Sequence, residues 1–567
     1  MLPLIAPHIP RRYNKDAARA GNEKARRIFF IMYDLIIRGG TVVDGTGAPR
    51  YQADVAIKGD KITCIAPHIE EKGAREIDAK GQVVSPGFID YHSHSDNSIL
   101  LGPDGYNYLE QGVTTEITGQ CGTAPAPSYT GSLQEEKEIL PPEKFAEVEK
   151  ACDSYTSFID YVSHMELGNN MAFYIGQGNV RGRVMGFDDS LPTKEQLEEM
   201  KAWVRQAMEC GYLGMTTGLV YAPSVYAGEE ELVELAKVVG EYGGSYASHI
   251  RGEADNVVES VEEAIRVGEK AGIPVVISHL KVIGKQNEGL SEKVLQVIED
   301  ANARGVKVRA DQYPYLAGSA PFISCIPPKF HVGGVEKLVE NLKDPEFRKK
   351  VTYSIENEYQ EFASNLVDAG FEGTLMAGCA KTPQYVGKTI AQIAEKEGKD
   401  PWDVCFDLLI ANDGMAQGIY FNQNESDMMR IIAHPYVMGG SDWSNYQTHL
   451  DRDKVGGGHP RGTSTFITRL ALLRDHGLQT LEQAVHSVTG LPAEMSGIDG
   501  IGCLKEGAHA DICVFDYAAL GADSDYLHPF RKNRGLSYVV VNGKVAVENG
   551  ESNGVKNGRV LKKAPKA

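Results

Sequence analysis

Apolar and polar residues alternate with two different periods along the chain, and the change of period divides it into regions. Strands are predicted near the amino terminus at residues 34–45, 54–57 and 61–65, and near the carboxyl terminus at residues 511–516, 537–541 and 544–547. Gly59-Asp60 and Asn542-Gly543 are typical hairpin turns. Two β-rich ends that flank a long middle predict one small sheet domain assembled from both termini.

In the middle of the chain, short apolar strands alternate with amphipathic helices. The predicted strands cover residues 113–117, 171–175, 212–217, 244–248, 274–278 and 306–311. Helices are predicted between them, for example at residues 193–210, 256–271 and 291–304. Gly272 is a helix stop and Pro274 opens the next strand. Repeated βα units with short loops predict a parallel sheet, and this many units favour a closed barrel.

The alternation weakens between residues 316 and 424, which we interpret as an insertion, or lid subdomain, over the mouth of the barrel. The predicted fold class is therefore α/β: a (β/α)₈ TIM-like barrel with a small β-sandwich domain built from both chain ends. Predicted boundaries are 1–31 for a leader, 32–85 and 498–567 for the small β domain, 86–315 and 425–497 for the barrel, and 316–424 for the insertion.

The leader is basic, with seven basic and two acidic residues between positions 11 and 27. A mitochondrial-type presequence and a disordered tail both fit this charge. We favour the tail, with the compact protein starting near residue 32.

Composition narrows the classes of partner. The 567-residue chain has 58 basic and 77 acidic residues, hence a net charge of −19, which argues against nucleic acid or an anionic membrane as a partner. No stretch of 18 apolar residues occurs, so no membrane span is expected. The nine cysteines include no CxxC pair and predict free thiols in a reducing compartment, hence a cytoplasmic protein. The sequence allows an oligomer without requiring one.

Candidate chemistry begins at the apolar strand that ends in His92 and His94. Residues two apart on a strand point to the same side, so both imidazoles can converge on one ion. In a barrel, this end of the strand is the catalytic face.

Other metal-ligand side chains follow other predicted strands. His249 and His279 each come after a serine at a strand's carboxyl end, Cys121 lies just past the strand that ends near residue 117, and Asp442 follows a short apolar run. Imidazole, thiolate and carboxylate are ligands that zinc accepts. Such residues at five separate strand ends predict a metal site.

These segments make the chain recognisable. It resembles the amidohydrolase superfamily, and within it the N-acyl-D-amino acid deacylases (D-aminoacylases), over roughly residues 33–550. The resemblance rests on the motifs PGFIDYHSHSD, GQCG, YASHIRGE, VVISHLKV, DQYPY, GGSDW and GHPRGTSTF. The GQCG motif favours the D-aminoacylase branch, because many other relatives bridge two metals with a carboxylated lysine.

The resemblance implies an enzyme, a barrel of the amidohydrolase type, and zinc as cofactor. Cys121, His249 and His279 correspond to a tight zinc site. His92, His94 and Asp442 correspond to an adjacent weaker or second site, which Cys121 is able to bridge. Asp442 corresponds to the catalytic base and acid.

The implied reaction is zinc-dependent hydrolysis of the amide bond of an N-acyl-D-amino acid, a small molecule, to a D-amino acid and a carboxylate. Such a substrate carries a carboxylate, and the guanidinium of Arg461 can grip it in two places. Tyr313 and Ser319 resemble the family's other carboxylate contacts, and Arg251 is a secondary candidate. The preference for D-amino acids over L-amino acids is implied by the resemblance; the spacing of the motifs does not indicate it.

Two alternatives remain open. A cyclic-amide hydrolase of the dihydroorotase or hydantoinase kind uses the same barrel, but would need a bridging lysine; Lys281, two residues beyond His279, is the obvious candidate, although we interpret it as a supporting residue. A metal-free scaffold protein is disfavoured because every expected ligand type is present. Two departures from the family pattern are Gln177, where many relatives have a histidine, and a long stretch at residues 445–458, which puts the substrate range in doubt.

Overall fold

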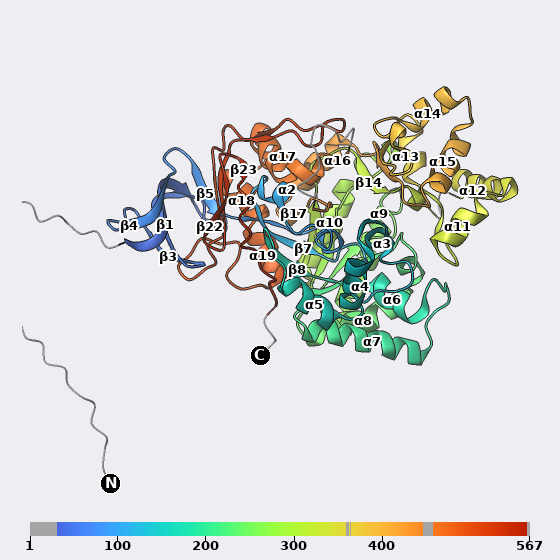
Figure 1. Cartoon of the computed structure of the whole chain (residues 1–567), viewed down its shortest axis with the longest axis horizontal. Helices are drawn as coiled ribbons and strands as arrows, with labels where there is room; N and C mark the ends of the chain where they lie inside the picture. The colour runs from blue at the N-terminus through green and yellow to red at the C-terminus, as the bar shows by residue number, and fades with distance from the viewer. Residues whose placement is uncertain (1–30, 359–361, 363, 446–457, 564–567) are drawn as a thin grey trace, which may run out of the picture.

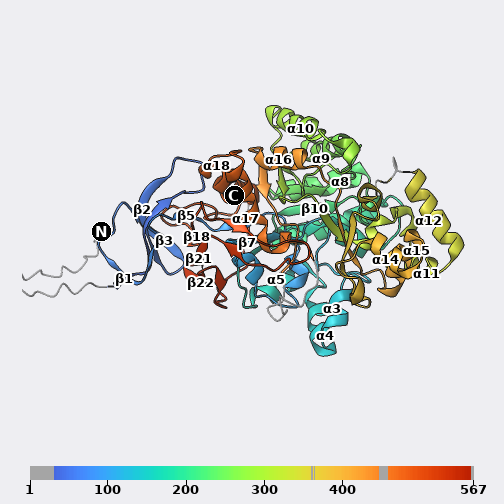
Figure 2. The same cartoon turned by 90° about the horizontal axis from the view of Figure 1, so that it is seen from above.

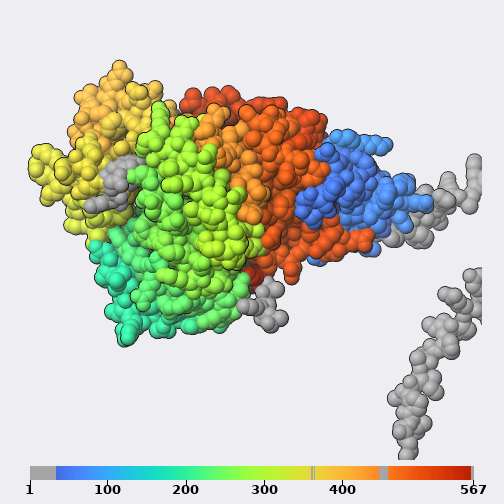
Figure 3. Space-filling view, turned by 180° about the vertical axis from the view of Figure 1, so that it is seen from behind, coloured from blue at the N-terminus to red at the C-terminus, as the bar shows by residue number. Residues whose placement is uncertain are grey.

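The structure is a computed structural model that describes residues 31–358, 362, 364–445 and 458–563. The predicted leader falls almost entirely outside these residues, as does nearly all of the long stretch at 445–458. At opposite ends of the molecule lie the first strands, in blue, and the segment of residues 316–424, in yellow and orange (Figures 1 and 3). Between them stands a barrel of parallel strands.

Eight strand positions form the barrel: the six strands predicted in the middle region, and β6 and β17, which close it. In chain order the strands are β6 (Phe88–Asp90), β7 (Val113–Thr118), β8 (Asn170–Phe173) with its continuation β9 (Ile175–Gly176), β10 (Gly214–Gly218), β11 (Ser245–His249), β12 (Val275–Ile277), β13 (Val308–Gln312) and β17 (Val437–Gly439). Neighbouring strands pair in parallel. The Tyr91 N–H donates to the Gly439 carbonyl at 3.3 Å, which joins the last strand to the first.

The strand predicted at residues 171–175 is interrupted at Tyr174. Residues before this point pair with β7, whereas Ile175 and Gly176 turn to pair with β10. The Tyr174 hydroxyl lies 2.6 Å from the hydroxyls of both Tyr91 and Ser245 inside the barrel. The break therefore lets one strand change partners while its tyrosine ties three strands together.

Helices cover the outside of the barrel. They include α7 (Lys194–Glu209), α8 (Glu229–Glu241), α9 (Val257–Ala271), α10 (Ser291–Ala303), α16 (Glu425–Ala433), α17 (Arg461–Asp475), α18 (Leu481–Ser487) and α19 (Gly490–Ser496). Figure 2 shows α8, α9 and α10 side by side. In α9 the buried Val257, Val261 and Ile265 recur at helical spacing. A Cβ on Gly268 would lie 2.0 Å from a methyl of Val275, so only glycine allows this close helix–strand approach.

Strands from both chain ends form one nine-stranded sheet. It contains β1 (Ile31–Val42), β2 (Tyr51–Lys58), β3 (Lys61–Ala66), β4 (Lys72–Asp78), β5 (Val83–Pro86), β18 (Ile512–Phe515), β21 (Leu536–Val541), β22 (Lys544–Glu548) and β23 (Glu551–Ser552). The two ends meet where β5 pairs with β18. The predicted α/β fold class, a barrel plus a small β domain built from both ends, is confirmed; the residue boundaries of the domains stay a prediction.

Residues 316–424 have a core of their own. An antiparallel sheet of β14 (Gly318–Pro321), β16 (Gln417–Tyr420) and β15 (Thr374–Gly378) carries the helices α11 (Val335–Asn341), α12 (Pro345–Asn357), α13 (Asn365–Ala369), α14 (Ile390–Glu397) and α15 (Pro401–Ala411). The base of this segment touches the barrel loops, because Gln423 donates to the Tyr313 hydroxyl at 3.1 Å and the Gly284 N–H donates to the Asn422 carbonyl at 2.8 Å.

No helix within the described ranges combines the length and the apolar character needed to cross a bilayer.

Candidate metal centre

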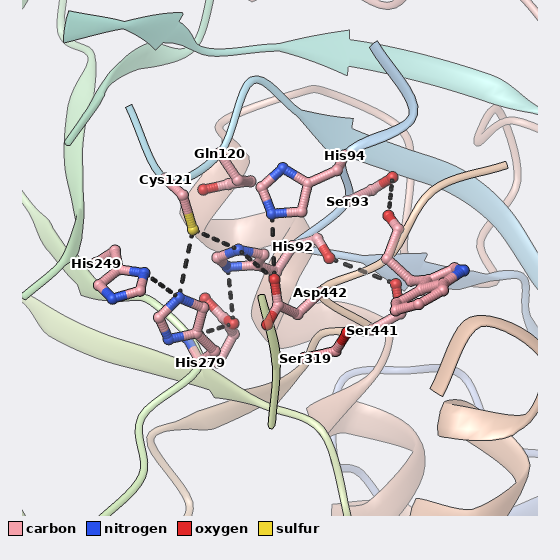
Figure 4. A network of polar contacts seen from close by, with 12 residues as sticks. His92, Ser93, His94, Gln120, Cys121, His249, His279, Ser319, Ser441 and Asp442 are labelled. Atoms are coloured by element: carbon pink, nitrogen blue, oxygen red, sulfur yellow. Dashed lines mark hydrogen bonds and ion pairs between the residues drawn. The ribbon is translucent and has the colours of Figure 1, made fainter. Parts of the chain in front are cut away.

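The candidate ligands meet at the carboxyl ends of the barrel strands. His92 and His94 follow β6, Cys121 follows β7, His249 ends β11, His279 follows β12 and Asp442 follows β17. Their side chains point toward one another (Figure 4). The structure thus brings together all six residues that the sequence predicts as ligands.

Cys121 lies at the middle of this cluster. Its Sγ is 3.4 Å from Nε2 of His92 and 3.3 Å from Nε2 of His279. Asp442 Oδ1 lies 3.5 Å from His92 Nε2 and 3.1 Å from His94 Nε2. His249 Nδ1 lies 2.8 Å from His279 Nε2. The donor atoms of His92, Cys121, His279 and Asp442 lie within 4.8 Å of one another. This group combines residues that the sequence analysis assigned to two different sites. The division into a tight and a weaker site stays a prediction.

The donor set fits zinc. Donor atoms bound tetrahedrally at the usual zinc distances of roughly 2.0–2.3 Å lie about 3.3–3.6 Å apart. The contacts between Cys121 Sγ and the two imidazoles, and between Asp442 and His92, fall in or next to this interval. His94 is the most open of the group, with 28% of its side chain exposed. The other five candidate ligands are buried, so solvent reaches the cluster mainly at His94.

The backbone at three of these residues adopts the left-handed conformation. The φ angles are 53° at Cys121, 35° at His279 and 53° at Asp442, three of six positive values among the non-glycine residues that the structure describes. Such conformations cost of order 1–3 kcal/mol and cluster at functional sites. The strained backbone therefore occurs at the positions where these three side chains turn into the barrel mouth.

Glycines on either side of Cys121 make its loop fit. A Cβ on Gly119 would lie 2.2 Å from the Tyr174 carbonyl oxygen, and one on Gly122 would lie 2.5 Å from the Gly218 nitrogen. Both glycines have φ above +70°. The GQCG motif is thus explained by a tight loop pressed against two neighbouring strands.

Two carboxylates that the sequence reasoning missed orient the histidines. Asp311 Oδ1 lies 3.1 Å from His92 Nδ1 and accepts the backbone N–H of His279 at 2.8 Å. Glu253 Oε1 lies 3.1 Å from His279 Nδ1. A carboxylate on the far nitrogen fixes the tautomer and ring orientation of a metal-binding histidine. Both residues lie inside motifs already noted, DQYPY and YASHIRGE, at the ends of strands.

Lys281 supports this arrangement. Its Nζ donates to Glu253 Oε1 at 2.6 Å and to the His279 carbonyl at 3.1 Å. Burial would lower the pKa of Lys281, but the charges of Glu253, Tyr313 and Asp442, together with the hydrogen bond to Glu253, outweigh burial and raise the pKa. A lysine held as a cation by a carboxylate is a supporting residue, as the sequence indicates, and not a free amine poised for carboxylation.

Opposite charges keep the site ionised. Burial alone would raise the pKa of the Cys121 thiol, but the positive charges of His279 and His92 hold it well below its ordinary value. Burial likewise opposes ionisation of Asp442, and Arg461 and His279 hold its pKa well below its usual range. Thiolate and carboxylate are the forms that bind a metal.

Three of the four residues predicted to bind the substrate's carboxylate lie together beside Asp442. Arg461 Nη1 donates to Asp442 Oδ2 at 2.8 Å, and Nη2 donates to the Ser319 carbonyl at 3.0 Å. The Arg461 guanidinium also lies 4.8 Å from the centre of the Tyr313 ring.

Arg251 differs from the other three. Its guanidinium bonds to Glu263 of α9 and to the carbonyls of Val225 and Ala227. All of its nitrogens therefore have structural partners, and the sequence did not show this because Glu263 belongs to the following helix.

Gln177 takes a structural position as well. Its amide nitrogen donates to Glu231 at 2.7 Å and its amide oxygen accepts from the Ser224 hydroxyl at 2.5 Å. The side chain is fully buried. The buried amide therefore links Glu231 to Ser224.

The chain is similar to known proteins in both sequence and fold. Residues 75–547 match the amidohydrolase family. The D-aminoacylase of Alcaligenes xylosoxydans xylosoxydans is 33% identical over 93% of this chain and 97% of its own length. A D-aminoacylase crystal structure superposes with a TM-score of 0.76 at 33% identity, covering 94% of this chain and all of the other.

A further structure is that of the N-acyl-D-glutamate deacylase of Bordetella bronchiseptica, in complex with zinc and a phosphonate that mimics the tetrahedral intermediate. It is 29% identical, has a TM-score of 0.76, and the match covers 94% of this chain and 99% of that one. The match over most of both chains, together with the cysteine and histidine cluster, assigns this chain to the amidohydrolase family and to its D-aminoacylase group.

Proposed function

We propose that the chain hydrolyses the amide bond of N-acyl-D-amino acids with zinc as cofactor, releasing a D-amino acid and a carboxylate. The observation that carries this proposal is the cluster of Cys121, two histidines and Asp442 beside the guanidinium of Arg461. The relatives with this fold act, by name, on D-amino acid derivatives. The free thiols of all nine cysteines support a reducing, cytoplasmic location.

The metal-binding residues would be Cys121, His249 and His279, with His92, His94 and Asp442 on the adjacent side. Zinc bound there supplies a Lewis acid and lowers the pKa of a coordinated water toward neutrality. Asp311 and Glu253 hold His92 and His279 in the required orientation through their Nδ1 atoms.

Asp442 is the proton carrier in this proposal. Its carboxylate is ionised and lies between the imidazole of His94 and the guanidinium of Arg461. It takes a proton from the attacking water and returns it to the amine nitrogen as the C–N bond breaks, which balances the hydrolysis.

Arg461 binds the substrate's carboxylate. Its planar guanidinium lies 4.8 Å from the centre of the Tyr313 ring and 5.2 Å from that of the Trp443 ring, and these contacts restrain its orientation. Tyr313 and the segment around Ser319 complete this side of the site. Because Arg461 adjoins Asp442, a substrate held by its carboxylate presents its amide next to the proton carrier.

The experiment that tests the function measures amine release from paired N-acetyl-D- and N-acetyl-L-amino acids, and ring opening of a hydantoin and dihydroorotate, with zinc supplied. We expect turnover of the D forms alone. Ring opening without release of amine from either acetyl series would overturn the proposal in favour of a cyclic-amide hydrolase.

Arg461→Lys tests carboxylate recognition. A lysine keeps the charge but loses the two-pronged grip, and a hydrogen bond to a charged group contributes about 1.5–3 kcal/mol, so we expect KM to rise about 10- to 100-fold. The matched substrate is the carboxamide of the same N-acetyl-D-amino acid. We expect wild type to prefer the acid and the variant to lose that preference. Comparing the two substrates cancels any effect through Asp442; an unchanged preference would remove Arg461 from the substrate site.

A further inference from the structure

Two buried carboxylates that the proposed reaction does not use hydrogen-bond to the loops at residues 92–95 and 441–445, here called the ligand loops. The first is Asp90, the last residue of β6, whose side chain is fully buried. Its Oδ1 accepts the backbone N–H of His92 and that of Ser441, each at 3.0 Å. Its Oδ2 accepts the Ser441 hydroxyl. One carboxylate thus joins the loop after β6 to the loop after β17.

The second carboxylate is Glu116 of β7, which is also fully buried. Its Oε2 accepts the hydroxyls of both Ser93 and Ser95, the two residues that flank His94. Its Oε1 accepts the Asn169 amide at 2.7 Å. Ser95 in turn accepts the backbone N–H of Asn445 at 3.0 Å, which again reaches the loop after β17.

Between these carboxylates the two loops run side by side. The Asp442 N–H donates to the His92 carbonyl at 2.8 Å, and the His94 N–H donates to the Trp443 carbonyl at 2.7 Å. The Tyr108 hydroxyl also donates to the Trp443 carbonyl, at 2.7 Å. The positions of His92, His94 and Asp442 therefore depend on one shared register between segments that lie about 350 residues apart in the chain.

We propose that Asp90 and Glu116 are positioning residues that lock the loops 92–95 and 441–445 in register, and so hold His92, His94 and Asp442 against Cys121. The kinetic test of this inference rests on the proposed function, whereas a second test measures zinc binding and does not depend on that function. Burying a carboxylate is costly unless donors surround it. Here each carboxylate accepts from three donors, and all of these six except the Asn169 amide belong to the two ligand loops. A displacement of about 1 Å at reacting groups can cost on the order of 10²-fold in rate.

The test compares Asp90→Ala with Asp90→Asn. Alanine leaves the N–H groups of His92 and Ser441 without an acceptor, and we expect kcat to fall about 10- to 100-fold, the usual effect of losing a supporting partner at a metal site. KM should stay within about threefold, because Asp90 touches neither Arg461 nor Tyr313. Asparagine keeps an oxygen for both N–H groups and should restore most of kcat. Should Asp90→Ala not fold, Ser441→Ala carries the same test with an expected tenfold fall in kcat.

Asp427→Ala is the matched control. Asp427 of α16 is a buried carboxylate that accepts the N–H groups of Gly289 and Ser291 and the Ser291 hydroxyl, and none of these partners belongs to the ligand loops. It should lower the melting temperature as Asp90→Ala does, while kcat stays as in wild type. Equal losses of kcat in the two variants would make Asp90 merely structural and overturn the inference.

Zinc affinity separates this inference from the proposed function. Competition with a chelator measures the affinity for the weakest-bound zinc in each folded variant. Should wild type hydrolyse none of the substrates, the proposed function fails, and a tenfold or larger loss of zinc affinity in Asp90→Ala but not in Asp427→Ala still supports the positioning role. Equal affinity in the two variants of an inactive enzyme would contradict it.

Discussion

Asp442→Asn should lower kcat by about 10³-fold on N-acetyl-D-amino acids while the protein keeps its tightly bound zinc. General acid–base catalysis by a positioned side chain contributes typically about 10²–10⁴-fold, and the amide of asparagine cannot carry the proton. The zinc remains because Cys121, His249 and His279 are unchanged. Stopped assays of amine release together with metal analysis of the same preparation measure both quantities.

Asp413→Asn is the matched control for this substitution. Asp413 also has a left-handed backbone, with φ of 50°, but its carboxylate is largely exposed and pairs with Lys381. We expect wild-type kcat from this variant. An Asp442→Asn enzyme that keeps kcat within about threefold would show that another group moves the proton.

Cys121→Ala should remove both the zinc and the activity. The thiolate lies within 3.4 Å of two imidazoles and is the only sulfur among the described ligand candidates, so its loss leaves those histidines without their central partner. Stabilisation by a bound metal amounts to several kcal/mol in the transition state, which corresponds to a fall in kcat of at least about 10³-fold. Zinc content after dialysis and kcat at saturating substrate test this expectation.

Cys152→Ala is the control for the loss of a thiol. Cys152 is also buried and free, but burial raises the pKa of its thiol, whereas the pKa of Cys121 is lowered by its histidines. The control should keep its zinc and its kcat. Full zinc occupancy in Cys121→Ala would mean that the remaining ligands suffice, and would remove the thiolate from the centre.

The sequence predicted where the candidate ligands lie in the fold, because their positions at strand ends follow from local patterns. Each apolar run ends at a residue such as His249 or His92, and parallel strands bring their carboxyl ends to one face. The hairpins at Gly59 and Asn542 followed in the same way from turn chemistry. Strand ends and hairpin turns can be predicted because they depend only on residues that are close together in the sequence.

What the sequence could not predict depends on contacts between distant segments. Asp311 and Glu253 were missed because only the folded barrel brings them to the Nδ1 atoms of His92 and His279. Arg251 was expected to bind substrate, but the folded helix α9 places Glu263 against it. The break at Tyr174 arises because the strand exchanges β7 for β10 as its partner, which no local pattern indicates.

The most direct test of the account is the zinc X-ray absorption spectrum of the loaded enzyme. The account predicts one sulfur neighbour at about 2.3 Å and nitrogen neighbours at about 2.0–2.1 Å, with the sulfur signal absent from Cys121→Ala protein supplied with zinc. A spectrum of nitrogen and oxygen neighbours alone, with a carboxyl group found on Lys281 by mass spectrometry, would contradict the account and favour a cyclic-amide hydrolase.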